Sequence, residues 1–346
     1  MSHSILQFAI LGALTFIAVG ILTPIIRKLA IKIGAVDAPT VARKVQKEPV
    51  PYLGGVAIAV GVIGASYGAL IATDFSFENL KLASSVLIPA TAIAVMGLWD
   101  DLKGLQPWPR LIAQTVMGAI VATILTATGT MGVAFGNTVI DYTFTIIWIV
   151  GVCNSINFFD NHDGGAAGTV AVITFFLFFI AYDRQQVYVS ALAAVTAGAT
   201  AGFLIWNRHP AKIYMGDAGA LFLGIIVSVL TIQLSPGILQ SYLSLSIPVI
   251  LMATPILDTS VAVISRLNRG ISPFTGGRDH LSHRLMRKGL GRKSTAITLW
   301  AMAAFYGVIA LALYTWPDTL GVQALVFAAV VWVGQFIYFI KIPSEG

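Results

Sequence analysis

Apolar runs of about 20 residues, separated by short polar segments, recur along the whole chain. A helix needs about 20 apolar residues to cross a hydrocarbon core of about 30 Å, and only helices or closed barrels satisfy their backbone groups there. The pattern therefore predicts an all-α, polytopic transmembrane bundle of eleven helices. The predicted spans are 5–26, 53–73, 82–99, 109–128, 143–159, 167–182, 187–206, 218–234, 243–265, 295–315 and 319–340.

The composition supports a membrane protein. Of 346 residues, 57% are hydrophobic and only 10% are charged, which excludes a soluble globular fold. The sequence shows no linker, low-complexity tract or repeat, so we expect one domain over 1–346. The first run lacks a basic leader and a small-residue cleavage site, so we expect it to stay as a helix and the mature chain to equal this one.

When the chain is threaded through the membrane along these predicted spans, the basic residues fall mainly on one side. Of the 21 lysines and arginines, 19 fall on one side, and only Lys81 and Arg184 fall on the other. The positive-inside rule makes the basic side cytoplasmic. We therefore expect a multi-pass protein of a bacterial-type plasma membrane, with its N-terminus outside and its C-terminus inside.

Five aspartates lie at the ends of apolar runs, all on the basic side: Asp100, Asp101, Asp160, Asp163 and Asp217. A charge at the centre of a spanning helix costs about 2.5–3.5 kcal/mol on insertion scales, so acids in such segments are expected near the interface or in a watery cleft. Their convergence predicts a functional site on the cytoplasmic face.

Asp100 and Asp101 close the third run, and Lys103 follows in a turn. Adjacent helical residues point about 100° apart, so the two carboxylates are expected to have different roles. One would bind a divalent cation, and the other would accept a proton or hold the metal's water. A solvated helix end is the alternative.

A polar side chain recurs every third residue at Asn154, Asn157, Asp160 and Asp163, before Gly164–Gly165. Amides and carboxylates in this arrangement suit a nucleobase edge, ribose hydroxyls or a metal, and the glycines allow close backbone approach. Interhelical hydrogen bonding without a ligand is the alternative. His162, within this run, is expected to be an interfacial polar residue.

Asp217 precedes the eighth run, where a helix N-terminus favours anions such as phosphates. It is either the N-cap of that helix or a metal ligand, and one carboxylate can serve both purposes. Asp258, inside the ninth run, is expected to be a structural anchor rather than a catalyst.

The loop 266–293 is the most basic segment, with His280 and His283 three residues apart and Arg278 and Arg284 beside them. Arginine and histidine form charge-assisted hydrogen bonds that suit a diphosphate. A plain positive-inside loop would explain the arginines but not the paired histidines. A zinc site is discounted because ligands are too few, and the single cysteine, Cys153, lies elsewhere.

A weaker signal opens the second run. The glycines Gly54 and Gly55 allow close backbone approach there, and Lys44 and Lys47 precede them and favour anions. A basic loop that simply enters a helix is the alternative.

The runs LWDDLKG, NSINFFDNHDG, MGDAG and DHLSHRL, in this order, resemble the polyprenyl-phosphate N-acetylhexosamine-1-phosphate transferases, over roughly residues 5–315. The SPF run before HLSHRL is more similar to the N-acetylglucosamine-1-phosphate branch than to the phospho-N-acetylmuramoyl-pentapeptide branch. The chain departs from the family pattern at Asn161-His162, Gly165 and Ser282, which bears on nucleotide contacts rather than on the reaction class.

The resemblance implies transfer of a sugar-1-phosphate from a UDP-sugar to a polyprenyl phosphate such as undecaprenyl phosphate, with release of UMP and dependence on Mg²⁺, or alternatively Mn²⁺. Its partners would be those two substrates and the membrane, without nucleic acid, and a homodimer is a further expectation. The competing class is a secondary transporter with intramembrane acids, whose sites would lie near the bilayer midplane on broken helices.

The residue patterns and the resemblance together assign the site. The predicted catalytic residues are Asp100, Asp101, Asp217, His280 and His283. The predicted metal ligands are Asp217, Asp101 and Asn157. The predicted substrate contacts are Lys47, Gly54, Gly55, Lys103, Asn157, Asp160, Asp163, Tyr214 and Arg278.

Overall fold

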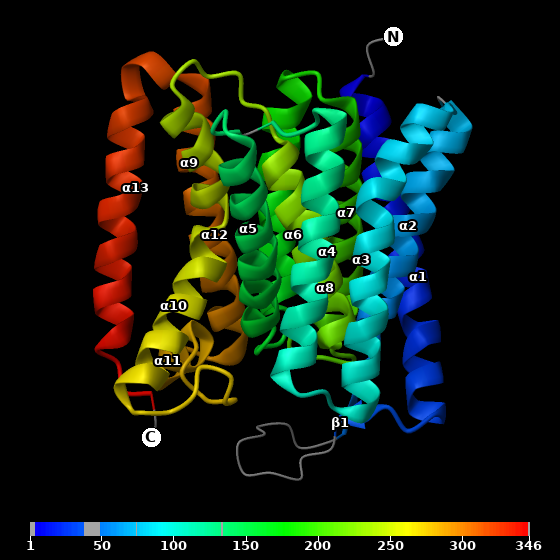
Figure 1. The fold of residues 1–346 in the computed structure, drawn as a ribbon. Coiled ribbons are helices and arrows are strands. Elements are labelled where there is room, and N and C mark those ends of the chain that lie inside the picture. Colours follow the sequence, from blue (N-terminus) through cyan, green and yellow to red (C-terminus); the bar gives the residue numbers. More distant parts are fainter. Residues whose placement is uncertain (1–3, 38–48, 74, 133, 345–346) are drawn as a thin grey trace.

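The computed structural model of the chain describes residues 4–37, 49–73, 75–132 and 134–344. Within these ranges the protein is a bundle of long helices, in which α1 begins at one end and α13 finishes at the other (Figure 1). The helices are α1 Ile5–Lys32, α2 Gly54–Thr73, α3 Phe77–Lys103, α4 Pro107–Thr128, α5 Thr138–Phe159, α6 Gly165–Asp183, α7 Val187–Asn207, α8 Gly216–Gln233, α9 Ser241–Leu251, α10 Ala253–Asn268, α11 Leu281–Arg287, α12 Arg292–Thr315 and α13 Pro317–Ile340.

The predicted transmembrane bundle is confirmed. Among the described residues, ten helices are long and apolar enough to cross a membrane, and the bent pair α9–α10 makes an eleventh span. Two short strands, β1 Val36–Asp37 and β2 Val50–Pro51, pair antiparallel at the end of the bundle where α3 finishes (Figure 1).

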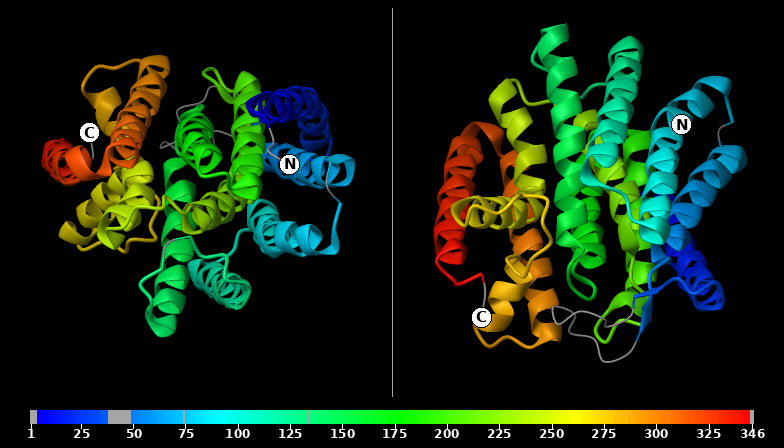
Figure 2. Two further views of the ribbon diagram at one scale, coloured as in Figure 1. Left: turned by 90° about the horizontal axis from the view of Figure 1, so that it is seen from above. Right: turned by 60° about the horizontal axis from the view of Figure 1, so that its bottom comes forward.

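The ninth span differs from the single helix predicted over 243–265. It breaks at Met252, and α10 runs at 69° to α9 (Figure 2). Pro255 explains the break, because it has no N–H for the carbonyl of Leu251 and its ring crowds that carbonyl. As a result α10 turns aside at the end of the bundle that carries the predicted site residues.

Helix α8 forms the centre of the bundle. Every residue from Ala218 to Gln233 is buried, whereas α1 and α13 expose most of their apolar surface. A helix that is apolar on all sides is stable only when other helices or lipid surround it. The neighbours that enclose α8, chiefly α3, α5 and α2, therefore fix the position of its first turn.

Candidate active site

The turn before α8 is pinned to the start of α2. The N–H groups of Gly54 and Gly55 donate to the carbonyls of Tyr214 and Met215, at 2.9 and 2.8 Å. Gly216 has a φ of +73°, and a Cβ there would lie 2.5 Å from the carbonyl oxygen of Tyr52. Only glycine fits this turn, and the turn places Asp217 in the first turn of α8.

Asp101 caps α8. Its two carboxylate oxygens accept the backbone N–H groups of Asp217 and Ala218, at 2.9 and 3.0 Å. The interpretation of Asp217 as the N-cap of its own helix is wrong, because Asp217 lies inside α8, which begins at Gly216, and a carboxylate from α3 accepts the N–H groups of its first turn. The predicted role of Asp101 as a metal ligand stays a prediction, and it would use lone pairs that the cap leaves free.

Arg110, in the first turn of α4, joins two predicted site residues. Its Nη1 donates to Oδ2 of Asp100 at 2.6 Å and to Oδ2 of Asp217 at 2.9 Å. Asp100 also accepts the N–H of Leu105 at 2.5 Å. The two adjacent aspartates thus differ in partner, as expected from their directions on the helix. Arg110 itself was counted only as a cytoplasmic charge, since nothing in the sequence pairs it with a residue 107 positions away.

Asn157 lies beside Asp217, as predicted. Its Nδ2 donates to Oδ1 of Asp217 at 2.6 Å, so one amide and one guanidinium hold the two carboxylate oxygens. Asn154, one turn earlier, instead donates to the side chain of Gln114 at 2.6 Å. The polar ladder is therefore divided between the site and an interhelical hydrogen bond, which was the alternative interpretation.

Asp160 is a half-buried carboxylate that lacks a counter-charge. Within the described part of the chain no hydrogen bond or ion pair reaches its side chain. Burial, followed by the negative charges of Asp217, Asp101 and Asp163, raises the pKa of Asp160 to about 8. With Asp100, five carboxylates thus share this site, and Arg110 contacts two of them, Asp100 and Asp217.

Asp163 and Tyr214 lie at the adjacent end of the site. Asp163 Oδ2 accepts from Nδ1 of His209 at 2.7 Å and from the N–H of Ala211 at 3.2 Å, which fixes the loop before α8. Burial and the charge of Asp163 raise the pKa of the Tyr214 hydroxyl. The structure therefore brings Asp160, Asp163 and Tyr214 together, as the predicted nucleotide end requires.

A second cluster lies between α10 and α11. His280 Nδ1 and the N–H of Leu281 donate to the two oxygens of Asp258, at 2.7 and 2.6 Å. Asp258 is only 1% exposed and holds the start of α11, as expected for a structural anchor, while its exclusion from catalysis stays a prediction. Nε2 of His280 lies 3.1 Å from a guanidinium nitrogen of Arg266. The imidazole ring is thus held between the Asp258 carboxylate and the Arg266 guanidinium.

Arg266 also binds Asp279 through two bonds of 2.8 and 2.7 Å. Burial would raise the pKa of Asp279, but these hydrogen bonds and the charges of Arg266 and His280 outweigh it, and the pKa is lowered. The pair is nearly fully buried, at 3% and 1% exposure, so it fixes one arrangement of the loop. Sequence reasoning assigned no role to Arg266.

The two clusters meet at the end of α5. The hydroxyl of Ser282 donates to the side-chain carbonyl of Asn161, and the ring of Phe158 lies against both His280 and Arg266. Burial, with the nearby charges of His280 and Arg287, lowers the pKa of His283 to about 3. His283 is therefore neutral at physiological pH.

Nearby, Nε2 of His162 donates to the carbonyl of Arg292 at 2.8 Å, and burial lowers the pKa of His162. Arg278 is half-buried, and its carbonyl accepts from Arg287 at 2.7 Å. The basic loop is thus folded onto the bundle, with His283 neutral and its arginines held by local partners.

The remaining predicted contacts have other surroundings. Gly54 and Gly55 are buried, and added Cβ atoms would lie 2.4 Å from the ring of Phe203 and 2.1 Å from the backbone of Gly219. The structure gives these glycines a packing role. Lys103 is exposed in the last turn of α3, and Lys47 lies outside the described residues.

The described ranges hold no group of three histidine, cysteine, aspartate or glutamate side chains arranged as a ready-made metal cage. Mg²⁺ does not require such a cage, because it usually takes one or two protein carboxylates and fills its other positions with water and substrate phosphates. Asp217, in reach of solvent at 29% exposure, and Asp160, without a partner of its own, are carboxylates of this kind.

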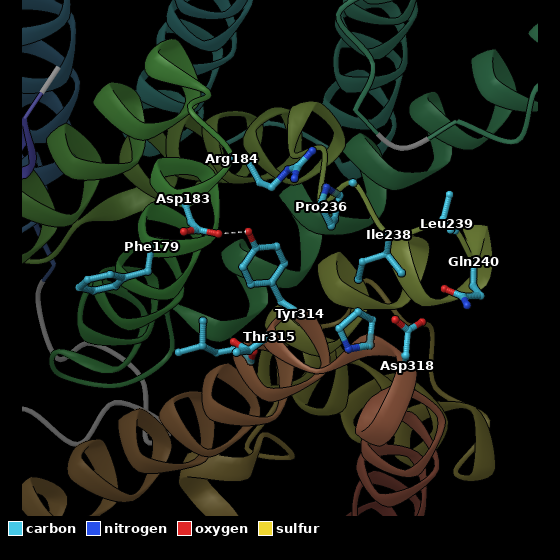
Figure 3. Close-up of a pocket in the computed structure, with 13 residues that line it drawn as sticks. Phe179, Asp183, Arg184, Pro236, Ile238, Leu239, Gln240, Tyr314, Thr315 and Asp318 are labelled. Carbon is cyan, nitrogen blue, oxygen red and sulfur yellow. Dashed lines mark hydrogen bonds between the residues drawn. The ribbon is translucent and has the colours of Figure 1, made fainter. Parts of the chain in front are cut away.

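A cavity of about 670 Å³ lies at the other end of the helices. Asp183 and Arg184, where α6 ends, face Tyr314 of α12, whose hydroxyl donates to Asp183 (Figure 3). The cavity contains none of the predicted site residues. A smaller cavity of about 260 Å³ lies beside Asp163, between α7 and α12.

Comparison with known proteins agrees with this geometry. Residues 83–235, which include Asp100, Asp101, Asn157, Asp160 and Asp217, match the model of "Glycosyl transferase family 4".

Three relatives extend the match. The chain is 30% identical to the Bacillus subtilis protein named "Probable undecaprenyl-phosphate N-acetylglucosaminyl 1-phosphate transferase", over 99% of this chain and 91% of that protein. It is 29% identical to the decaprenyl-phosphate N-acetylglucosaminephosphotransferase of Mycobacterium tuberculosis, over 94% and 88%. It is 27% identical to the phospho-N-acetylmuramoyl-pentapeptide-transferase of Corynebacterium kroppenstedtii, over 80% and 87%. The chain therefore belongs to glycosyl transferase family 4, the membrane-bound polyprenyl-phosphate N-acetylhexosamine-1-phosphate transferases.

Proposed function

We propose that the chain transfers N-acetylglucosamine-1-phosphate from UDP-N-acetylglucosamine to a polyprenyl phosphate and releases UMP. The observation that carries the proposal is the site around Asp217. Carboxylates from α3, α8 and the end of α5 converge there, and Arg110 bridges two of them. The names of the two relatives of highest identity above support N-acetylglucosamine as the sugar.

The reaction has a simple bond balance. An oxygen of the lipid phosphate forms a bond to the phosphorus that carries the sugar, and the bond from that phosphorus to the oxygen of UMP breaks. The lipid phosphate is a monoester with a second pKa of about 6, so it is mostly dianionic at pH 7. The chain therefore needs to position and neutralise the phosphates rather than supply a strong base.

Asp217 and Asp160 are the residues that we propose would hold Mg²⁺. When bound, Mg²⁺ would neutralise charge on the diphosphate. Asp101 would act mainly by holding the first turn of α8, and hence Asp217, in place. Asp100 would orient Arg110, whose guanidinium is also within reach of a phosphate because it is partly exposed, at 21%.

The uridine end of the donor would lie at Asp160, Asp163 and Tyr214, and His280 and His283 would face the phosphates from the start of α11. A neutral histidine such as His283 offers a hydrogen-bond donor without adding a charge that must be desolvated. The site would open to the cytoplasm, because 19 of the 21 lysines and arginines fall on the site's side of the predicted threading. A homodimer remains a prediction that cross-linking in membranes tests.

The transporter alternative fits this arrangement less well. Its coupling acids would lie at the midplane on broken helices, whereas the carboxylates here occupy the ends of α3 and α5 and the start of α8. The bent pair α9–α10, the one found among the described residues, carries Asp258 as a structural anchor for α11.

Washed membranes test the proposal. They are supplied with polyprenyl phosphate, Mg²⁺ and a panel of UDP-sugars, and UMP release is measured. We expect release with UDP-N-acetylglucosamine and none with the Asp217→Asn variant. Release only with UDP-N-acetylmuramoyl-pentapeptide would mean that the transferred sugar is N-acetylmuramoyl-pentapeptide rather than N-acetylglucosamine. No release with any donor would overturn the enzyme assignment.

A further inference from the structure

The cavity beside Asp163 is lined by charged residues at the helix ends and by apolar residues further along the helices. Its lining comes from the last turns of α7, the first turns of α12 and the loop between α5 and α6. Trp300 closes one side, and its indole N–H donates to the carbonyl of Gly164 at 2.9 Å. The cavity is therefore built from fixed elements rather than from a loop alone.

Two cations line it, Arg208 directly after α7 and Lys293 in the first turn of α12. Both are exposed, and no carboxylate or hydrogen-bond acceptor in the described ranges engages either side chain. The one acid in the lining, Asp163, already accepts from His209 and Ala211. The cavity thus presents two cations to an anion.

The lining further along α7 and α12 is apolar. Ile205 lies three residues before Arg208, and Ile297 lies four residues after Lys293. At 1.5 Å per residue, these isoleucines sit about 5 Å further along their helices than the cations. They are 43% and 49% exposed on membrane-spanning helices, so the cavity opens toward lipid. Charge at the helix ends with apolar surface below matches the headgroup and first methylenes of a phospholipid.

We infer that this cavity binds the phosphate headgroup of an anionic phospholipid from the same membrane leaflet, between Arg208 and Lys293, with an acyl chain against Ile205 and Ile297. A soluble phosphate would gain nothing from the exposed isoleucines. A zwitterionic lipid would bring a cation to a mouth that already carries two. Charge complementarity therefore selects an acidic headgroup such as phosphatidylglycerol.

Native mass spectrometry of the purified protein in detergent tests the inference, with phosphatidylglycerol or phosphatidylcholine added and no donor or acceptor present. The measured quantity does not depend on turnover, so its failure is separate from a failure of the proposed function. We expect phosphatidylglycerol to bind more tightly than phosphatidylcholine. Replacing both cations, Arg208→Gln with Lys293→Gln, should weaken phosphatidylglycerol binding about 30-fold, at about 1 kcal/mol per basic residue.

The matched control is Lys288→Gln with Lys341→Gln, which removes two exposed lysines from the same end of the bundle but outside the cavity. It should bind phosphatidylglycerol like the parent chain. Equal losses in both double variants would overturn the inference in favour of a general charge effect. Displacement of phosphatidylglycerol by inorganic phosphate would also overturn the inference. Displacement by polyprenyl phosphate that occurs only in the chain that keeps both cations would overturn it too, because either result assigns the cavity to another phosphate.

Discussion

Replacing Asp101 should lower stability first and activity only as a consequence. The carboxylate accepts two backbone N–H groups at the start of α8, at 2.9 and 3.0 Å, and lies at the positive end of that helix. Removing a capping side chain costs about 0.5–2 kcal/mol, and the central position of α8 favours the upper limit. We therefore expect Asp101→Ala to lose about 2 kcal/mol of unfolding free energy, and Asp101→Asn, which keeps one acceptor, about half as much.

The single cysteine makes the assay simple. Cys153 is fully buried in α5, so a thiol-reactive fluorophore labels it only when the bundle opens. Heating the purified protein in detergent with this reagent gives the unfolding midpoint of each variant. The midpoint should fall by several degrees in Asp101→Ala and by less in Asp101→Asn.

Asp217→Asn is the control for this experiment. Its amide oxygen can still accept from Asn157, whereas its amide nitrogen takes the place of the oxygen that accepts from Arg110. Its midpoint should fall less than that of Asp101→Ala, because the change leaves the cap of α8 intact, while its turnover is lost. An Asp101→Ala variant with an unchanged midpoint would refute the capping role and would return Asp101 to the ligands of the site.

Other predictions follow from the same contacts. Arg110→Gln leaves Asp100 and Asp217 without their shared cation, so the KM for the UDP-sugar should rise at least about tenfold; an unchanged KM would remove Arg110 from the site. Gly216→Ala forces an L side chain to a φ of +73° and within 2.5 Å of a carbonyl oxygen, so the thiol-labelling midpoint should drop by the equivalent of about 2 kcal/mol or more. The folded pKa of His283 is about 3, so below its unfolded pKa of about 6.5 the unfolded state binds the proton and stability is lost as pH falls. His283→Gln should therefore lose about 2 kcal/mol less than the parent chain between pH 6.5 and pH 5, and equal losses would contradict a neutral His283.

Hydropathy predicted the spans well because every spanning helix must carry about 20 apolar residues, whatever its neighbours. It failed at the ninth span, where the apolar run continues through the break at Met252. A window of mean hydropathy does not register Pro255, which sets the bend through its missing N–H. The short helix α11 was also missed, because Leu281–Arg287 is too short and too basic to resemble a span.

The sequence predicted which residues form the site better than it predicted which of them contact one another. Acids at the ends of apolar runs must share one face, so the convergence of Asp100, Asp101, Asp160 and Asp217 followed from the threading. The partners depend on tertiary structure: Arg110 bridges α3 to α8, and Asp101, rather than Asp217, caps the first turn of α8. Only the packing of α8 between α2, α3 and α5 determines these contacts.

The fate of the phosphorus attached to the sugar tests the central claim most directly. UDP-N-acetylglucosamine labelled with ³²P in its β-phosphate is incubated with the purified chain, polyprenyl phosphate and Mg²⁺, and the lipid and aqueous phases are separated. The account predicts that the label moves into the lipid phase together with the sugar, that unlabelled UMP appears in equal amount, and that Asp217→Asn forms neither product. Sugar in the lipid phase without the label, with labelled UDP left in the water, would contradict it, because the sugar alone would then have been transferred.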